Sequence, residues 1–223
     1  LPVLARMELR GVAVDRAHLE SLSAELGTRA NDFAQAAYAE IGREVNLGSP
    51  KQLQEVLFDQ LGMPKTRATK TGYTTDAAAL AELQETNPHP FLGLLLQHRD
   101  VTKLRQIVET LTKSVDATGR IHTTYGQIGA ATGRLSSNDP NLQNIPVRTA
   151  EGRRVREAFI AAPGHVLLSA DYSQIELRIM AHISGDEALI RAFSEGRDIH
   201  TATASEIFGV ELGEVTSDHR RTA

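Results

Sequence analysis

The sequence predicts an α+β protein, in which a helical first half is followed by a segment with strands and then by further helices. Three observations predict this order. Apolar residues recur at helical spacing through most of residues 15–113. A turn followed by alternation from residue 116, and an apolar run at 165–171, are typical of strands. Helical periodicity then returns and continues to the end, so boundaries near residues 115 and 184 follow.

The first half is expected to consist of helices joined by one polar loop. Residues 15–44 are rich in Ala, Leu and Glu, and Asp15 is the expected N-cap residue. A second helix is expected over 48–62, where Ser49 can cap the N-terminus and Pro50 suits the first helical position. The remaining expected elements are a loop over 64–76 and helices over 76–85 and 90–113.

The second half combines strands, turns and helices. Gly119 marks a turn before a strand-like alternation, and the many turn formers of 130–146 predict a loop. The apolar run of 165–171, which ends on a carboxylate, is expected to be a buried strand. The expected helices are a short basic one at 151–160, one at 173–185 with Ile175, Ile179 and Ile183 along one side, and three more over 186–196, 198–209 and the terminal segment.

Composition and charge exclude several classes of protein. With 41% hydrophobic and 23% charged residues, the 223-residue chain can build a sizeable core. It has no cysteine, which excludes disulfides and cysteine-bound zinc and fits a reducing cytoplasm. The apolar run at 91–96 is too short to cross a bilayer, so no membrane partner is expected. Because the net charge is −4, a nucleic-acid surface must come from local basic patches.

Asp171 ends the predicted buried strand directly before a predicted helix. A carboxylate in this place is held rigidly and still faces solvent, and Mg²⁺ prefers a few carboxylates together with water and phosphate oxygens. The alternative is a helix N-cap, supplied by Asp171 or Ser173, and this stretch alone favours the cap. Glu176 and Arg178 follow on the polar side, where either could be a solvated surface group.

Polar side chains that can contact DNA gather in the predicted loop at 130–146. Arg, Asn and Gln side chains reach base edges and sugar oxygens in DNA grooves. The alternative is a polar loop whose Asn and Asp residues only form turns. The absence of Lys and Glu among them favours contact, and the candidates are Arg134, Asn141, Gln143 and Asn144.

Three basic patches could follow a phosphate backbone. Residues 148–156 contain four arginines and one glutamate, and the loop 64–76 contributes three more cations. Arg99 and Lys103 are four residues apart, so they share one face of the predicted helix. Each patch alone is more often a solvated face, but three in an acidic chain favour a path for phosphates.

His200 lies in the first turn of a predicted helix that Asp198 caps. A helix N-terminus with a histidine suits an anion, and the alternative is a histidine satisfied by local hydrogen bonds. Arg220 near the end is either a phosphate binder or part of a helix surface.

Four stretches in this order and spacing resemble the bacterial DNA polymerase I family, the A-family polymerases. The resemblance extends from the GVAVD stretch near residue 11 to the final HRRTA, and the stretches that carry it are TGRLSSNDPNLQNIPVRT, DYSQIELR, GDEALIRAF and EGRDIHTATAS. It implies a right-hand architecture. Residues 1–115 would be the thumb, 116–183 the first part of a palm with an antiparallel sheet, and 184–223 the first helices of the fingers.

The resemblance also implies roles for individual residues. Asp171 matches a catalytic aspartate that binds two metal ions, and the Tyr172 carbonyl matches another ligand. Glu176 matches a residue beneath the incoming sugar that excludes a 2′-hydroxyl, so Asp171 and Glu176 are the catalytic candidates. The implied nucleotide-binding residues are Gln174, Glu176, His200 and Arg220. The implied DNA-binding residues are Arg99, Lys103, Arg134, Asn141, Gln143 and Asn144.

The implied activity is templated addition of deoxynucleotides to a primer 3′ end in DNA replication and repair. The implied partners are primer-template DNA and deoxynucleoside triphosphates, with two Mg²⁺ ions that Mn²⁺ could replace, in a monomer of the bacterial cytoplasm at the nucleoid. The chain begins at Leu1 and ends within a helical pattern, so we expect a piece of a longer protein. The resemblance implies a second catalytic aspartate that this sequence lacks, so we expect the chain to be inactive alone.

Other functions stay open on the sequence alone. One is a DNA-binding module without catalysis, and another is a small metal-dependent nuclease that uses Asp171 with Glu176 or Asp186. Nothing in the sequence fixes those carboxylates around a shared pair of ions. A purely structural role leaves the Arg, Asn and Gln residues of the 130–146 loop unexplained.

Overall fold

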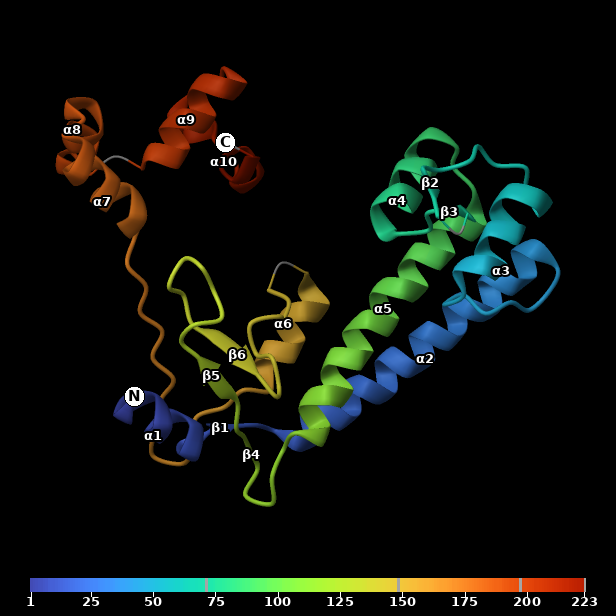
Figure 1. Cartoon of the computed structure of the whole chain (residues 1–223), viewed down its shortest axis with the longest axis horizontal. Coiled ribbons are helices and arrows are strands. Elements are labelled where there is room, and N and C mark those ends of the chain that lie inside the picture. The colour runs from blue at the N-terminus through green and yellow to red at the C-terminus, as the bar shows by residue number, and fades with distance from the viewer. Residues whose placement is uncertain (71, 148, 197, 223) are drawn as a thin grey trace. The chain divides into compact units, whose positions relative to one another are not determined.

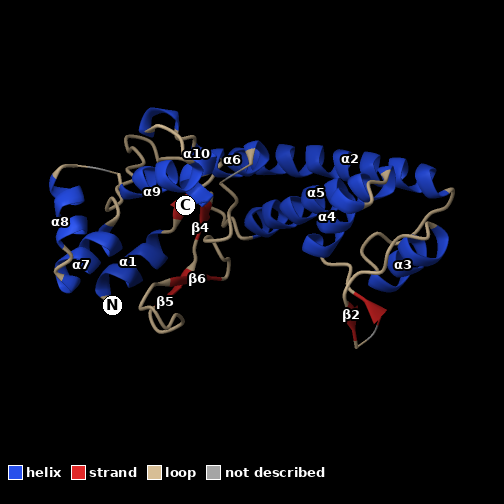
Figure 2. Ribbon diagram, turned by 90° about the horizontal axis from the view of Figure 1, so that it is seen from above, coloured by secondary structure: helices blue, strands red, loops and turns tan. Residues whose placement is uncertain are grey.

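The computed structural model describes residues 1–70, 72–147, 149–196 and 198–222, and it confirms a mainly helical α+β chain (Figures 1 and 2). The chain divides into two compact units, Leu1–Leu167 (unit 1) and Leu168–Ala223 (unit 2). The functional boundaries expected near residues 115 and 184 stay predictions. None of the helices in the described part of the chain is long and apolar enough to cross a bilayer.

Unit 1 contains six α-helices and six short strands within its described residues. The helices are α1 (Pro2–Arg10), α2 (Arg16–Ile41), α3 (Pro50–Gln54), α4 (Ala77–Thr86), α5 (Pro90–Lys113) and α6 (Ala150–Glu157), and a π-helical segment, η1 (Glu55–Gln60), follows α3. The strands are β1 (Val12–Ala13), β2 (Ala68–Thr69), β3 (Gly72–Tyr73), β4 (Arg120–Ile121), β5 (Thr124–Gly126) and β6 (Ser136–Asn138).

The long helices α2 and α5 form the central helix pair of unit 1. Asp15 caps α2 by accepting a hydrogen bond from the His18 amide, as the sequence predicts, and Gly42 ends the helix in the left-handed conformation. Leu22 near the start of α2 shares a core with Leu111 near the end of α5, and Ala37 near the end of α2 shares a second core with Phe91. The two helices are therefore antiparallel, and they lie side by side in Figures 1 and 2.

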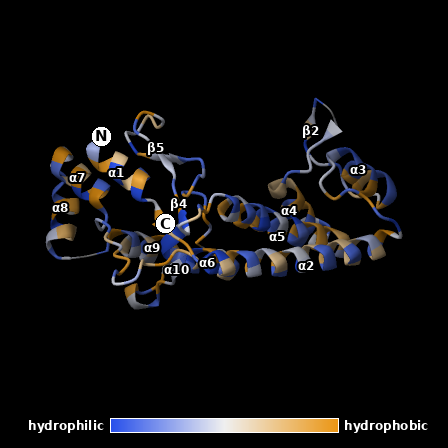
Figure 3. Cartoon of the chain, turned by 90° about the horizontal axis from the view of Figure 1, so that it is seen from below, coloured by the Kyte–Doolittle hydropathy of each residue, from blue (hydrophilic) through white to orange (hydrophobic). Residues whose placement is uncertain are grey.

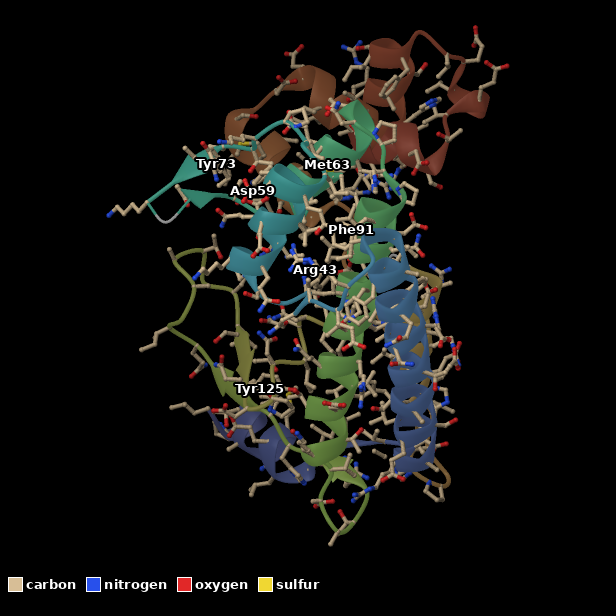
Figure 4. The ribbon with its side chains drawn as sticks, turned by 90° about the vertical axis from the view of Figure 1, so that its right-hand side faces the viewer. Arg43, Asp59, Met63, Tyr73, Phe91 and Tyr125 are labelled. Carbon is tan, nitrogen blue, oxygen red and sulfur yellow. The ribbon has the colours of Figure 1, made fainter. Side chains whose placement is uncertain are left out.

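The second core closes the end of unit 1 where α3, η1 and α4 lie. Ser49 caps α3 and Pro50 begins it, which confirms that part of the prediction, and Leu53, Leu57 and Leu80 are fully buried. Tyr73 of β3 packs against Phe58 with ring centroids 5.4 Å apart, and Figure 4 labels Tyr73 together with Met63 and Phe91 at this end. The expectation of a loop over 64–76 was wrong at β2 and β3. Two-residue strands are too short to show alternation.

The other strands form two small antiparallel pairs. β1 pairs with β4, and β5 pairs with β6 so that Tyr125 lies opposite Ser137. The strand expected after Gly119 is therefore confirmed, whereas β6 lies inside the segment expected to be a loop. An isolated bridge between Val14 and Phe159 joins the end of α6 to the same region.

The buried strand expected over 165–171 was wrong. These residues form an extended loop, and Val166 and Leu168 are 86% and 88% exposed. A strand needs a neighbour for its backbone N–H and C=O groups. Among the described residues no strand pairs with this segment, so its apolar composition alone could not make it a strand.

Unit 2 is helical, as the sequence predicts. Its elements are α7 (Ile175–Ser184), α8 (Glu187–Ser194), α9 (Ile199–Phe208), a short 3₁₀ turn η2 (Leu212–Glu214) and α10 (Ser217–Thr222). Asp186 caps α8 and Asp198 caps α9. Figure 3 shows hydrophobic residues along α7 and α8, and Ile183 of α7 is 76% exposed.

Candidate functional site

Asp171 lies in the exposed loop that leads to α7. Helix α7 begins after Gln174, whose φ of 53° is left-handed and whose side chain makes no capping hydrogen bond. Neither Asp171 nor Ser173 therefore caps this helix, so the structural alternative for Asp171 does not hold. Asp171 is exposed, Tyr172 is 80% exposed, and Glu176 lies exposed in the first turn of α7.

The described residues do not complete a metal site. No group of three or more His, Asp or Glu side chains among them is arranged to hold an ion. Asp171 offers one carboxylate and Tyr172 one backbone carbonyl, and both are oxygen ligands that suit a hard divalent cation. The two groups could therefore supply part of the ligand set of such an ion.

Three of the four predicted nucleotide-binding residues meet at the carboxylate of Asp198. Gln174 donates from Nε2 to Oδ1 at 2.7 Å, and the backbone amide of His200 donates to the same oxygen at 3.1 Å. Arg220 donates from Nε to Oδ2 at 2.8 Å, and the Thr201 hydroxyl donates there at 3.0 Å. We call this arrangement, which joins α7, α9 and α10, the Asp198 network.

The Asp198 network strongly favours the charged form of its carboxyl group. The hydrogen bond from Arg220 is the largest cause that holds the pKa of Asp198 far below its ordinary value; burial acts in the opposite direction, and Thr201 and Gln174 add to the lowering. The carboxyl group is therefore ionised at neutral pH. The half-buried His200 ring has no hydrogen-bond partner among the described residues, so local hydrogen bonds of the ring do not account for it.

Two of the predicted DNA-binding residues line one groove in unit 1. This groove has a volume of about 890 Å³, and both Lys103 of α5 and Asn144 line it. Its charges are mixed, because Arg29 and Glu151 of its wall form an ion pair at 3.4 Å. The groove therefore offers Lys103 and the side-chain amides of Gln97 and Asn144, and it is not a uniformly basic surface.

Arg99 and Lys103 lie on the same helix, but their side chains make different contacts. The half-buried Arg99 donates from Nη1 to the backbone carbonyl of Thr75, just before α4. Burial lowers the pKa of Arg99, and the nearby carboxylate of Asp76 acts in the opposite direction. Arg99 thus ties α5 to the start of α4, while Lys103 is exposed.

The segment 134–144 is ordered by its own hydrogen bonds. Asn141 Oδ1 accepts from the Gln143 amide at 2.9 Å, and Gln143 Nε2 donates to the Leu135 carbonyl at 2.8 Å. These are the turn-forming contacts of the alternative interpretation. All four candidates are exposed, and Asn141 and Gln143 also shape the loop through these hydrogen bonds.

Asp198 is the functional candidate that sequence reasoning missed. It was expected only as a helix cap, which it is, but it also gathers Gln174 from 24 residues earlier and Arg220 from 22 residues later. No local pattern reports such contacts. The only available signal was a capping aspartate two residues before a histidine singled out as an anion binder.

Comparison with known proteins gives consistent matches. The sequence profile described as DNA polymerase family A matches residues 16–223. The chain is 60% identical to DNA polymerase I of Mycobacterium tuberculosis over 220 residues, covering 98% of the chain and 24% of that protein. It is 51% identical to DNA polymerase I of Pseudomonas aeruginosa, covering 100% of the chain and 25% of that protein. The chain therefore spans about a quarter of the length of these relatives.

A solved structure is also similar over nearly the whole chain. The POL domain of Pol1 from M. smegmatis, in complex with DNA primer-template and dNTP, superposes with a TM-score of 0.87 at 56% sequence identity. The match covers 98% of this chain and 39% of that one.

Proposed function

The chain belongs to DNA polymerase family A, and from this premise we propose that it works as part of a DNA-directed DNA polymerase. This enzyme, a nucleotidyltransferase of replication and repair, adds deoxynucleotides to a primer 3′ end on a DNA template. The similarity over 98% of the chain to a POL domain bound to primer-template and dNTP is the observation that supports this most strongly.

The proposed division of labour follows the two units. Residues of unit 1 contact DNA: Lys103 meets a phosphate, and Arg134 and Asn144 reach sugar or base edges from exposed positions. Asn141 and Gln143 hold the loop that carries them. Arg99, one of the predicted thumb contacts, acts mainly through its bond to Thr75.

Residues of unit 2 bind the incoming deoxynucleoside triphosphate. Arg220 and His200 face its phosphates, because His200 lies in the first turn of α9, where an anion is favoured, and Asp198 holds the Arg220 guanidinium beside that turn. Gln174 and Glu176 lie at the start of α7 on either side of Ile175. In this proposal Glu176 lies beneath the sugar, where a carboxylate leaves no room for a 2′-hydroxyl.

Asp171 and the carbonyl of Tyr172 would hold the catalytic metal. Two Mg²⁺ ions, or Mn²⁺ in their place, would supply activation of the primer 3′-hydroxyl and stabilisation of the leaving pyrophosphate. In this loop Asp171 is the only carboxylate among the described residues, and no group of three or more acidic or histidine side chains there could hold a metal ion. We therefore propose that the 223-residue chain is inactive when isolated and that the intact protein acts as a monomer at the nucleoid of the bacterial cytoplasm.

A primer-extension assay tests the function. The intact protein, given a labelled primer-template, Mg²⁺ and all four dNTPs, is expected to extend the primer, whereas the isolated chain is expected to bind the same DNA without extending it. Loss of DNA after addition of Mg²⁺ without nucleotides would instead support a nuclease. Salt-sensitive binding with no extension by the intact protein would support a DNA-binding module.

A further inference from the structure

The Arg220 guanidinium donates to Asp198 through Nε, its inner edge. Its two terminal nitrogens, the outer edge, are left for another acceptor. The ion pair uses Nε, at 2.8 Å from Oδ2, and the Arg220 side chain stays 47% exposed. Among the described residues the two terminal nitrogens of Arg220 have no hydrogen-bond partner. A guanidinium that is held through Nε presents its terminal N–H groups as a planar fork, which matches the geometry of a phosphate.

The carboxylate also fixes the orientation of the Gln174 side-chain amide. An ionised carboxylate only accepts hydrogen bonds, so the NH₂ group of Gln174 must face Asp198 and the amide oxygen must face away. That oxygen, Oε1, is buried and has no partner among the described residues. A buried acceptor left unpaired is costly, which points to a donor supplied by a bound ligand or water.

Helix α10 depends on α9 for its placement. The His219 ring stacks on Phe208 near the end of α9 with ring centroids 4.7 Å apart, and the adjacent Arg220 reaches Asp198 at the other end. Since α10 has only six residues, it cannot hold an arginine in place by itself. The ion pair therefore supplies the orientation that the short helix cannot.

We infer that Asp198 is a positioning residue for the triphosphate of the incoming nucleotide, because it holds Arg220 by Nε and turns the outer edge of the guanidinium toward the phosphates. This inference rests on the proposed function and adds a residue to it. Asp198 touches no phosphate itself; it acts through Arg220 and orients Gln174 in the same network.

Single-turnover nucleotide insertion by the intact protein tests this role, because it separates the apparent Kd for dNTP from the maximal rate. Asp198→Asn keeps a good helix cap but removes the acceptor for Arg220. It is expected to raise the apparent Kd about tenfold or more, the usual effect of losing one hydrogen bond to a charged group, with a much smaller change in the maximal rate. Asp198→Glu, which keeps the charge, is expected to restore part of the affinity.

A double-mutant cycle distinguishes positioning from a general structural effect. Arg220→Ala is expected to raise the apparent Kd for dNTP, and Asp198→Asn is expected to add little in the Arg220→Ala background. Asp15→Asn, which changes the cap of α2 in the same way, serves as the matched control and is expected to leave the affinity unchanged. If the two substitutions instead raise the apparent Kd independently, so that their fold-changes multiply in the double variant, the inference is overturned.

Failure of the inference and failure of the proposed function give different results. If the wild-type protein extends no primer, the function is wrong; equilibrium binding of dNTP to the protein on a primer without a 3′-hydroxyl then still measures the same affinities. If wild-type protein extends the primer but Asp198→Asn leaves the apparent Kd unchanged, the inference alone is wrong.

Discussion

Arg154 of α6 donates two parallel hydrogen bonds to Glu25 of α2, from Nη1 to Oε1 at 2.8 Å and from Nη2 to Oε2 at 2.7 Å. This bidentate pair lowers the pKa of Glu25, with the bond from Arg154 as the largest cause, and it joins segments 129 residues apart in the sequence. Arg154 belongs to the basic patch at 148–156 that the sequence offered as a phosphate path. The structure instead uses this arginine to hold α6 against α2.

Arg154→Ala is therefore expected to act on stability. Both side chains are about 40–45% exposed, so solvent screens the pair and its loss is expected to lower the free energy of unfolding by no more than about 1 kcal/mol. Urea unfolding of the chain at low and high salt measures this, and the difference from wild type should shrink at high salt. Arg156→Ala, at an exposed position of the same helix, is the control. An effect of Arg154→Ala that does not depend on salt would contradict an electrostatic role.

Replacement of Arg99 and replacement of Lys103 are expected to have different effects. Arg99→Ala leaves the carbonyl of the buried Thr75 without its donor, and this should cost about 1–3 kcal/mol of stability. Lys103→Ala should leave stability nearly unchanged and lower DNA affinity, with the slope of log K against log salt smaller by about one. Thermal unfolding and salt-dependent DNA binding measure the two effects. Equal losses of DNA affinity with no loss of stability would restore Arg99 as a direct contact.

The loop that carries Asn141 and Asn144 is supported by a buried pair of hydroxyl groups. Ser137 Oγ lies 2.6 Å from Thr123 Oγ1 and accepts from the Leu142 amide at 3.2 Å. Ser137→Ala removes the acceptor from a buried site, so a loss of about 1–3 kcal/mol is expected, together with weaker binding of primer-template. Ser136→Ala, one residue earlier and less buried, should change stability by less than about 0.5 kcal/mol. Equal effects at 136 and 137 would contradict this account.

Asp116 makes the stability of unit 1 depend on pH. The Arg120 amide, the Thr118 hydroxyl and amide, and His122 all donate to it, and they hold its pKa at about 2, below the ordinary 3.8. A carboxyl group with a lowered folded-state pKa contributes stability above the unfolded-state value and loses it as the pH falls from about 4 to 2. Thermal unfolding across this range should show a smaller acid sensitivity in Asp116→Asn than in wild type. An unchanged pH profile would show that these hydrogen bonds do not set the pKa.

Local signals in the sequence were sufficient for most helices. The caps Asp15, Ser49 and Asp198 were predicted because each side chain bonds to an amide two or three residues later, which is a local contact. The apolar run HVLLSAD was misjudged because strand formation depends on a partner, and among the described residues none pairs with it. The two-residue strands β2 and β3 were missed because they give no measurable periodicity.

The candidate site was accessible from the sequence only in part. Gln174 was named by resemblance alone, whereas His200 and Arg220 were also candidates from their residue type and position, and the meeting of all three at Asp198 depends on how three helices pack. In the same way, Arg99 and Lys103 were paired by helical spacing, which does not reveal that Arg99 binds the Thr75 carbonyl.

Replacement of Asp171 tests the central claim, that this chain carries part of a polymerase active site, most directly. Primer extension by the intact protein with Mg²⁺ is compared for wild type, Asp171→Asn and Asp59→Asn, the last an exposed carboxylate of η1. The account predicts that Asp171→Asn slows extension by about 10³-fold or more with little change in DNA affinity, and that Asp59→Asn leaves both unchanged. Extension at the wild-type rate by Asp171→Asn would contradict the account.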